Sequence, residues 1–127
     1  MPKTILIVDD SPTEMKLMMS ALAPKGFNIM TATDGEEVFA KIASMKPDIV
    51  LLDVVMPKKN GYQVCRQIKT TPETKDIRVV LVTSKNQETD RFWGMKQGAD
   101  AYLTKPYKPE ELTDLPEPSR PEAGNGY

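Results

Sequence analysis

Acidic, hydroxyl and cationic side chains follow apolar runs at four places in the chain. Asp9 and Asp10 are adjacent carboxylates after the first run, and Asp53 follows a later one. Thr83 comes directly after a third run, and Lys105 comes two residues after a fourth. If the runs are strands of one parallel sheet, their carboxyl ends meet at the edge where such sheets bind ligands. The spacing therefore predicts one site with three carboxylates, a hydroxyl and an ammonium group.

Three carboxylates held close together need a cation, because each raises the pKa of the others. Mg2+ suits such a site, since it binds carboxylate, carbonyl and water oxygens and completes its shell with phosphate. A carboxylate can also be the nucleophile in phosphoryl transfer, while a metal ion and a lysine neutralise the phosphoryl oxygens. The predicted chemistry is Mg2+-assisted formation of an aspartyl phosphate.

The composition excludes several other kinds of protein. The 127 residues suffice for one ordinary domain, and a net charge of -1 gives no electrostatic support for nucleic-acid binding. The absence of histidine and the single Cys65 exclude histidine catalysis, most zinc sites and an intramolecular disulfide. No stretch approaches the roughly 20 apolar residues of a membrane span, and no signal peptide precedes the first apolar run. We therefore expect a cytoplasmic protein without membrane insertion, with Cys65 as a small buried hydrophobe.

The elements that must position the site alternate along the chain. Five short, β-branched runs predict strands, and the segments between them carry apolar residues at helical spacing. The predicted strands cover residues 3–8, 27–32, 49–52, 77–82 and 101–103. This alternation implies right-handed crossovers and an α/β fold with a doubly wound, five-stranded parallel sheet.

The predicted helices have apolar faces that should contact the sheet. These faces comprise Met15, Met18, Met19 and Leu22 in the first helix, Val38, Ile42 and Met45 in the second, and Phe92 and Met95 in the fourth. With Phe92 and Met95 against the sheet, Trp93 falls on the flank of the fourth helix. Its ring then lies either at the edge of the core or on a partner surface.

The fifth predicted helix is truncated. It begins well at Pro109, but Pro116 disfavours helical geometry at the residue before it, and more prolines and glycines follow. We expect a folded domain over residues 1–114 and a Pro/Gly-rich, disordered tail over residues 115–127. A short helix would leave apolar sheet exposed, to be covered by the tail or by a second chain in a homodimer, unless the sequence is that of a shortened protein.

Five motifs occur in order over residues 3–112. They are the acidic pair, LLDVVMP, Gly61 four residues after its proline, VTS and YLTKP. Together they resemble the receiver domain of two-component response regulators, in the single-domain, chemotaxis (CheY-like) style. The segments DDSPTE and QETDRFWGMKQGA are most similar to regulators of pilus-based twitching motility. The resemblance implies a flavodoxin-like sheet with strand order 2-1-3-4-5.

The resemblance also implies roles for the residues of the predicted site. Asp53 would be the phosphoacceptor, and Lys105 would pair with the phosphoryl oxygens. Asp10, Asp53 and the backbone carbonyl of Val55 would bind Mg2+, with Asp9 acting through a bound water.

Three further residues would complete the switch in such a domain. Thr83 would follow the phosphoryl group, and the ring of Tyr102 would turn inward as Thr83 moves. The peptide bond before Pro106 would be cis. Taken singly, the polar residues also allow plainer interpretations: Asp9 and Asp10 as a polar turn, Lys105 as a solvated turn lysine, and Tyr102 as an edge-strand aromatic.

The implied function is a phosphorylation-activated signalling switch. It would accept a phosphoryl group on Asp53 from a chemotaxis-type sensor histidine kinase and signal by protein contact, for example with a pilus motor or a related regulator. It would be no enzyme beyond its own phosphorylation and dephosphorylation. The alternative is a small Mg2+-dependent phosphohydrolase with an aspartyl-phosphate intermediate. Such enzymes usually carry D-x-D after one strand, whereas Asp9 and Asp10 are adjacent.

Overall fold

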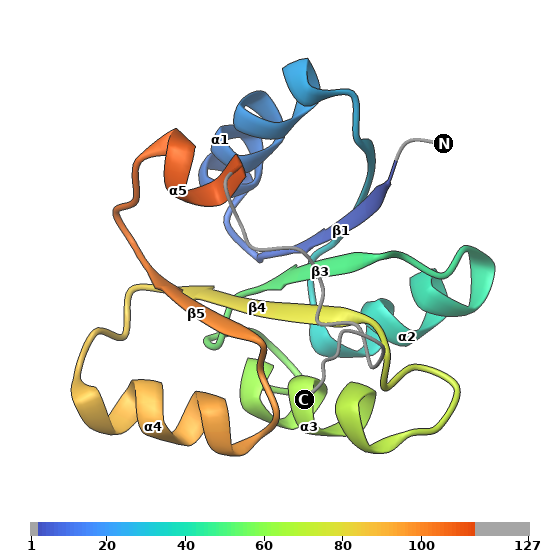
Figure 1. Ribbon diagram of the computed structural model, residues 1–127, viewed down its shortest axis with the longest axis vertical. Coiled ribbons are helices and arrows are strands. Elements are labelled where there is room, and N and C mark those ends of the chain that lie inside the picture. The colour runs from blue at the N-terminus through green and yellow to red at the C-terminus, as the bar shows by residue number, and fades with distance from the viewer. Residues whose placement is uncertain (1–2, 114–127) are drawn as a thin grey trace, which may run out of the picture.

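The protein is a parallel β-sheet covered by helices on both faces (Figure 1). The computed structural model describes residues 3–113. The strands are β1 (Thr4–Val8), β2 (Asn28–Ala32), β3 (Ile49–Leu52), β4 (Arg78–Thr83) and β5 (Ala101–Thr104). They lie in the order β2-β1-β3-β4-β5, and all neighbours are parallel. The predicted α/β fold, with its doubly wound sheet and its strand order, is confirmed.

The strand register brings the predicted polar positions to one edge of the sheet. Val8 at the end of β1 pairs with Leu52 at the end of β3, so the acids that follow them emerge side by side. Thr83 at the end of β4 pairs with Thr104 at the end of β5. Lys105 therefore leaves the sheet next to Thr83.

Helices cover each face of the sheet because alternate strand residues are apolar on both sides. The helices α1 (Pro12–Leu22) and α5 (Pro109–Thr113) lie on one face, with a short 3-10 turn η1 (Ala23–Lys25) after α1. The helices α2 (Gly35–Ser44), α3 (Gly61–Thr70) and α4 (Glu88–Lys96) lie on the other (Figure 1). Each face has its own apolar cluster, one around Ile7 and Met18 and one around Leu6 and Val64.

Most of the predicted core residues of α1 and α2 are buried, but two of them are exposed. Met15, Met18, Leu22, Val38 and Ile42 are buried in the core, and Cys65 is also buried. Met19 is exposed because the apolar stripe of α1 is narrower than predicted, and Met45 is exposed because α2 ends at the residue before it. These two residues were wrongly assigned to the core.

The predicted face of α4 is wrong. Phe92, Trp93 and Met95 are 57%, 55% and 45% exposed, and Gly94 is the residue that is buried against the sheet. A Cβ atom at position 94 would lie 2.8 Å from side-chain atoms of both Leu81 and Tyr102. The close approach that glycine permits therefore turns the large apolar side chains outward.

The C-terminal predictions are tested only up to Thr113. Leu112 of α5 is buried against the α1 face, which agrees with a helix that starts at Pro109. Residues 114–127 lie outside the described part of the chain, and so do the predicted domain boundary at 114 and the predicted tail. Among the described residues, no helix is both long and apolar enough to cross a membrane.

Candidate functional site

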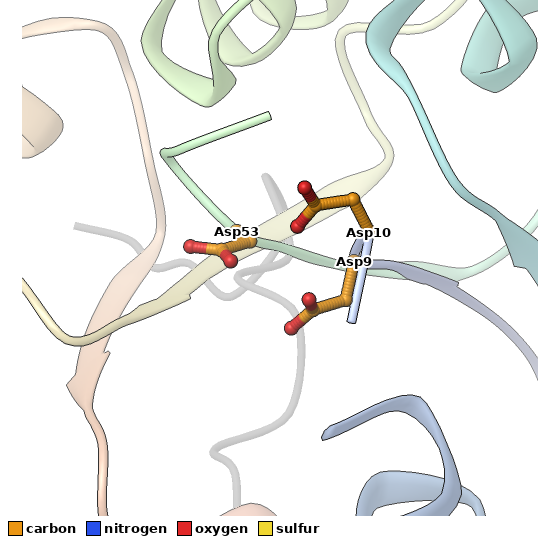
Figure 2. Close-up of side chains that lie close together, drawn as sticks. All are labelled: Asp9, Asp10 and Asp53. Atoms are coloured by element: carbon orange, nitrogen blue, oxygen red, sulfur yellow. The ribbon is translucent and has the colours of Figure 1, made fainter. Parts of the chain in front are cut away.

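Three carboxylates meet at the carboxyl edge of the sheet. Ligand oxygens of Asp9, Asp10 and Asp53 all lie within 4.8 Å of one another. Figure 2 shows Asp9 and Asp10 at the end of one strand and Asp53 at the end of its neighbour. Asp9 is 1% exposed and Asp53 is 8% exposed, whereas Asp10 is open to solvent. The site is therefore a partly buried acidic cluster with one accessible side.

The backbone holds the two buried acids in place. The Asp9 N–H donates to the Ala32 carbonyl at 3.2 Å, and the Asp53 N–H donates to the Val8 carbonyl at 3.0 Å. Both bonds continue the ladders of adjacent parallel strands. The rigid strands thus fix the carboxylates before any ligand is bound.

Lys105 lies among the carboxylates. Its Nζ is 2.7 Å from Oδ2 of Asp9, 3.4 Å from Oδ2 of Asp53 and 3.8 Å from Oε1 of Glu14. The Lys105 N–H donates to the Thr83 carbonyl at 2.8 Å, and the Lys105–Pro106 peptide bond is cis. Sequence reasoning missed Glu14, whose only signal is its place in the first turn of the helix that follows the acidic pair.

The charges of the site shift the pKa of two of its groups. Burial raises the pKa of Asp53; the charge of Lys105 opposes this shift, and the charge of Asp9 adds to it. Burial alone would lower the pKa of Lys105, but its hydrogen bond to Asp9 and the nearby carboxylates outweigh burial and raise it. The three aspartates and Glu14 thus lie around one ammonium group, which leaves an excess of negative charge.

The donor set fits a hard divalent cation. Carboxylate oxygens are preferred by Mg2+ and Mn2+ over softer metals, and the exposed Asp10 leaves room for water ligands. A divalent cation would also offset the excess of negative charge. The Val55 N–H donates to Oδ1 of Asp53 at 3.4 Å, so the loop after β3 folds back onto the cluster.

Thr83 and Tyr102 are connected through the loop after β4. Thr83 is fully buried, its hydroxyl accepts a hydrogen bond from the Lys85 N–H at 3.4 Å, and its side chain lowers the pKa of Asp53. Tyr102 is buried with its ring turned inward, and its hydroxyl donates to the Lys85 carbonyl at 2.8 Å. Both side chains therefore contact Lys85.

Sequence reasoning also missed Tyr62. Its hydroxyl donates to the Asp90 carbonyl at 2.9 Å and so links α3 to α4. The sequence carries no signal for this bond, because the two residues are far apart in the chain and their helices meet only in the folded structure.

In the absence of divalent metal, Asp53→Asn should raise the melting temperature by a few degrees at about pH 7. Because burial raises the folded-state pKa of Asp53, stability is lost as the pH rises through that value. Asparagine removes this loss. The gain should vanish below about pH 4, where the carboxyl is protonated in the unfolded chain as well. Calorimetry in EDTA at both pH values measures the difference in melting temperature. A melting temperature of Asp53→Asn below that of the wild type at pH 7 would contradict the prediction.

Comparison with known proteins places this site in one protein family. The family described as response regulator receiver domain matches residues 5–116. Protein PilH of Pseudomonas aeruginosa is 49% identical over 108 residues, which cover 85% of this chain and 89% of PilH. The chain spans about half or less of the transcriptional regulators it also matches.

Two solved structures share the fold. Chemotaxis response regulator CheY4 of Vibrio cholerae has a TM-score of 0.83 at 27% identity, over 90% of this chain and 95% of CheY4. The Mn(2+)-bound form of response regulator Rcp1 has a TM-score of 0.79 at 30% identity, over 89% of this chain and 88% of Rcp1. The acidic cluster thus lies in a fold that these proteins share.

Proposed function

The chain belongs to the response regulator receiver domain family, whose members are phosphorylation-activated signalling switches, and we propose that it accepts its phosphoryl group on Asp53. One observation carries this assignment. Asp53 stands at the end of a buried strand, with a carboxylate oxygen within 4.8 Å of those of Asp9 and Asp10 and its Oδ2 3.4 Å from the Lys105 Nζ. A carboxylate held there can attack phosphorus while the site neutralises the charge of the phosphoryl oxygens.

The roles of the other residues follow from their positions. Asp10, Asp53 and the Val55 carbonyl would hold Mg2+, with Asp9 acting through a water. The metal, when bound, neutralises charge on the phosphoryl oxygens. The Mn(2+)-bound Rcp1 structure supports a divalent ion in this fold. An Asp53 oxygen forms the new P–O bond, and the donor departs with the electrons of its bond to phosphorus.

Lys105 and Thr83 would act on the transferred group. Lys105 already lies 3.4 Å from Asp53 and would exchange part of its contact with Asp9 for a phosphoryl oxygen. The Thr83 hydroxyl would follow the phosphoryl group and draw Lys85 with it, while the Tyr102 ring already occupies its inward position. This change would convert phosphorylation into a rearrangement of the loop before α4.

The phosphodonor would be a sensor histidine kinase of the chemotaxis type, and the output would be protein contact. The family match supports this pairing, and the resemblance of DDSPTE and QETDRFWGMKQGA to twitching-motility regulators supports a role in pilus-based motility. Neither the family match nor the relatives favour the phosphohydrolase alternative. A homodimer remains a prediction, because it depends on how residues 114–127 cover the sheet.

Mass spectrometry of the intact protein tests the proposed function. After incubation with acetyl phosphate and Mg2+, the protein should gain one phosphoryl group, and EDTA should prevent the gain. Sustained release of inorganic phosphate from a phosphate ester, without stoichiometric labelling, would instead favour the phosphohydrolase.

Asp10→Asn should weaken Mg2+ binding by about tenfold or more, because it removes a charged oxygen ligand from the open side of the site. Isothermal titration calorimetry measures the dissociation constant directly. Glu14→Gln is the matched control, since Glu14 contacts Lys105 and is outside the proposed ligand set. Equal dissociation constants for Asp10→Asn and the wild type would remove Asp10 from that set.

A further inference from the structure

Two tyrosine hydroxyls hold the segment that joins β4 to α4, one at each end. Tyr102 of β5 donates to the Lys85 carbonyl at 2.8 Å, and Tyr62 of α3 donates to the Asp90 carbonyl at 2.9 Å. The segment begins two residues after Thr83 and ends in the first turn of α4. It is therefore the covalent path from the phosphorylation site to that helix.

Tyr62 is fixed relative to Asp53. The N–H of Gly61, the first residue of α3, donates to the Val54 carbonyl at 2.7 Å. A Cβ atom at position 61 would overlap the Asp53 carbonyl oxygen, so the start of α3 lies directly against the strand end. A capping box between Asn60 and Gln63 fixes this first turn of α3. The backbone of Tyr62 thus has little freedom to move when the site changes.

The two tyrosines are neighbours in the core below α4. Tyr102 belongs to the apolar cluster on this face of the sheet, and Tyr62 packs against that cluster. Burial raises the pKa of Tyr102, and the nearby Tyr62 raises it further. The Tyr102 hydroxyl therefore remains a protonated donor at neutral pH.

The helix α4 is also held elsewhere, including its C-terminal end, where the Cys65 thiol donates to the Gln97 carbonyl at 3.7 Å. Gly94 is its one buried residue, and the Arg91 guanidinium donates to the Tyr102 carbonyl at 3.1 Å. The Asp90 carboxylate accepts from the Gln87 N–H at 3.2 Å, which makes Asp90 part of the helix start. The Tyr62 bond to the Asp90 carbonyl therefore links this first turn of α4 to α3.

We propose that Tyr62 is a positioning residue of the switch, whose hydroxyl anchors the first turn of α4 to the strand end that carries Asp53. With the Asp90 end fixed by Tyr62, movement of Thr83 and Lys85 turns α4 about its N-terminal turn. Without the anchor, the same movement is absorbed in the loop. This inference rests on the proposed phosphorylation of Asp53.

Hydrogen exchange of residues 86–97, read by mass spectrometry, tests the anchor with Tyr62→Phe. Loss of one hydrogen bond should make exchange about three to ten times faster in the unphosphorylated protein. Treatment with acetyl phosphate and Mg2+ then gives the change in exchange rate caused by phosphorylation. In Tyr62→Phe this change should be less than half of the change in the wild type. Tyr107→Phe is the control, because its buried hydroxyl has no hydrogen-bond partner among residues 3–113 and lies on the opposite face of the sheet.

The outcomes separate the two proposals. Wild-type exchange in Tyr62→Phe, or equal acceleration in Tyr107→Phe, would overturn the anchor. So would an unchanged response to phosphorylation in a Tyr62→Phe protein that is fully labelled. A wild-type protein that takes up no phosphoryl group would overturn the proposed function instead, which the intact mass shows independently of exchange.

Discussion

Asp53→Asn is expected to abolish phosphoryl incorporation from acetyl phosphate and Mg2+, lowering it by at least about a hundredfold. An amide oxygen is a poor nucleophile, and the substitution also removes one negative ligand from the proposed metal site. Because Asp53 is fixed at the end of β3, 3.4 Å from the Lys105 Nζ, no other carboxylate can occupy its place without moving a strand. Intact mass after a fixed incubation measures the loss.

The control for this prediction is Asp76→Asn. Asp76 lies on the surface, where it pairs with Lys46, and it is remote from the cluster along the chain. The Asp76→Asn protein should take up as much phosphoryl group as the wild type. This result would show that an Asp-to-Asn change away from the site does not affect incorporation. Labelling of the Asp53→Asn protein to the wild-type level, with the phosphoryl group mapped to another residue, would contradict the assignment.

Gly61→Ala should destabilise the fold by about 3 kcal/mol, a large effect for the addition of one methyl group. The new Cβ would overlap the Asp53 carbonyl oxygen and approach the Val54 Cα to 2.7 Å. Both contacts are with backbone, so no rotamer change can relieve them. Either α3 or the end of β3 must shift, which should also weaken Mg2+ binding. Urea denaturation and a Mg2+ titration measure the two effects.

Gly26→Ala separates this steric effect from a conformational one. Gly26 has a φ of +84°, which disfavours alanine, but a Cβ there would meet nothing within 4 Å. Its cost should stay near 1 kcal/mol, with Mg2+ binding unchanged. Equal losses of stability in the two variants would show that the steric overlap of the new Cβ is not the cause of the loss in Gly61→Ala.

The apolar runs by themselves predicted the sheet and the position of its site. A short, uninterrupted, β-branched segment such as Ile49–Leu52, set between helical patterns, indicates a strand covered on both faces, and a polar residue directly after it then lies at the carboxyl edge. Asp9, Asp53 and Lys105 could therefore be expected at one place. This inference needs only local periodicity and the rule that connections between parallel strands cross over in one hand.

The contacts between elements could not be predicted in the same way. The outward face of α4 depends on the close approach of Gly94 to Leu81, and the Tyr62 hydroxyl finds the Asp90 carbonyl only after α3 and α4 have packed on the same face. Lys105 likewise lies nearer to Asp9 than to Asp53, although each acid follows a strand end.

The sequence thus determined which residues reach the carboxyl edge of the sheet, because strand periodicity and chain direction are local properties. The tertiary structure decided which of them touch and which face of α4 is free. Those outcomes depend on strand register, helix rotation and separations of a few tenths of an ångström, which no single segment encodes.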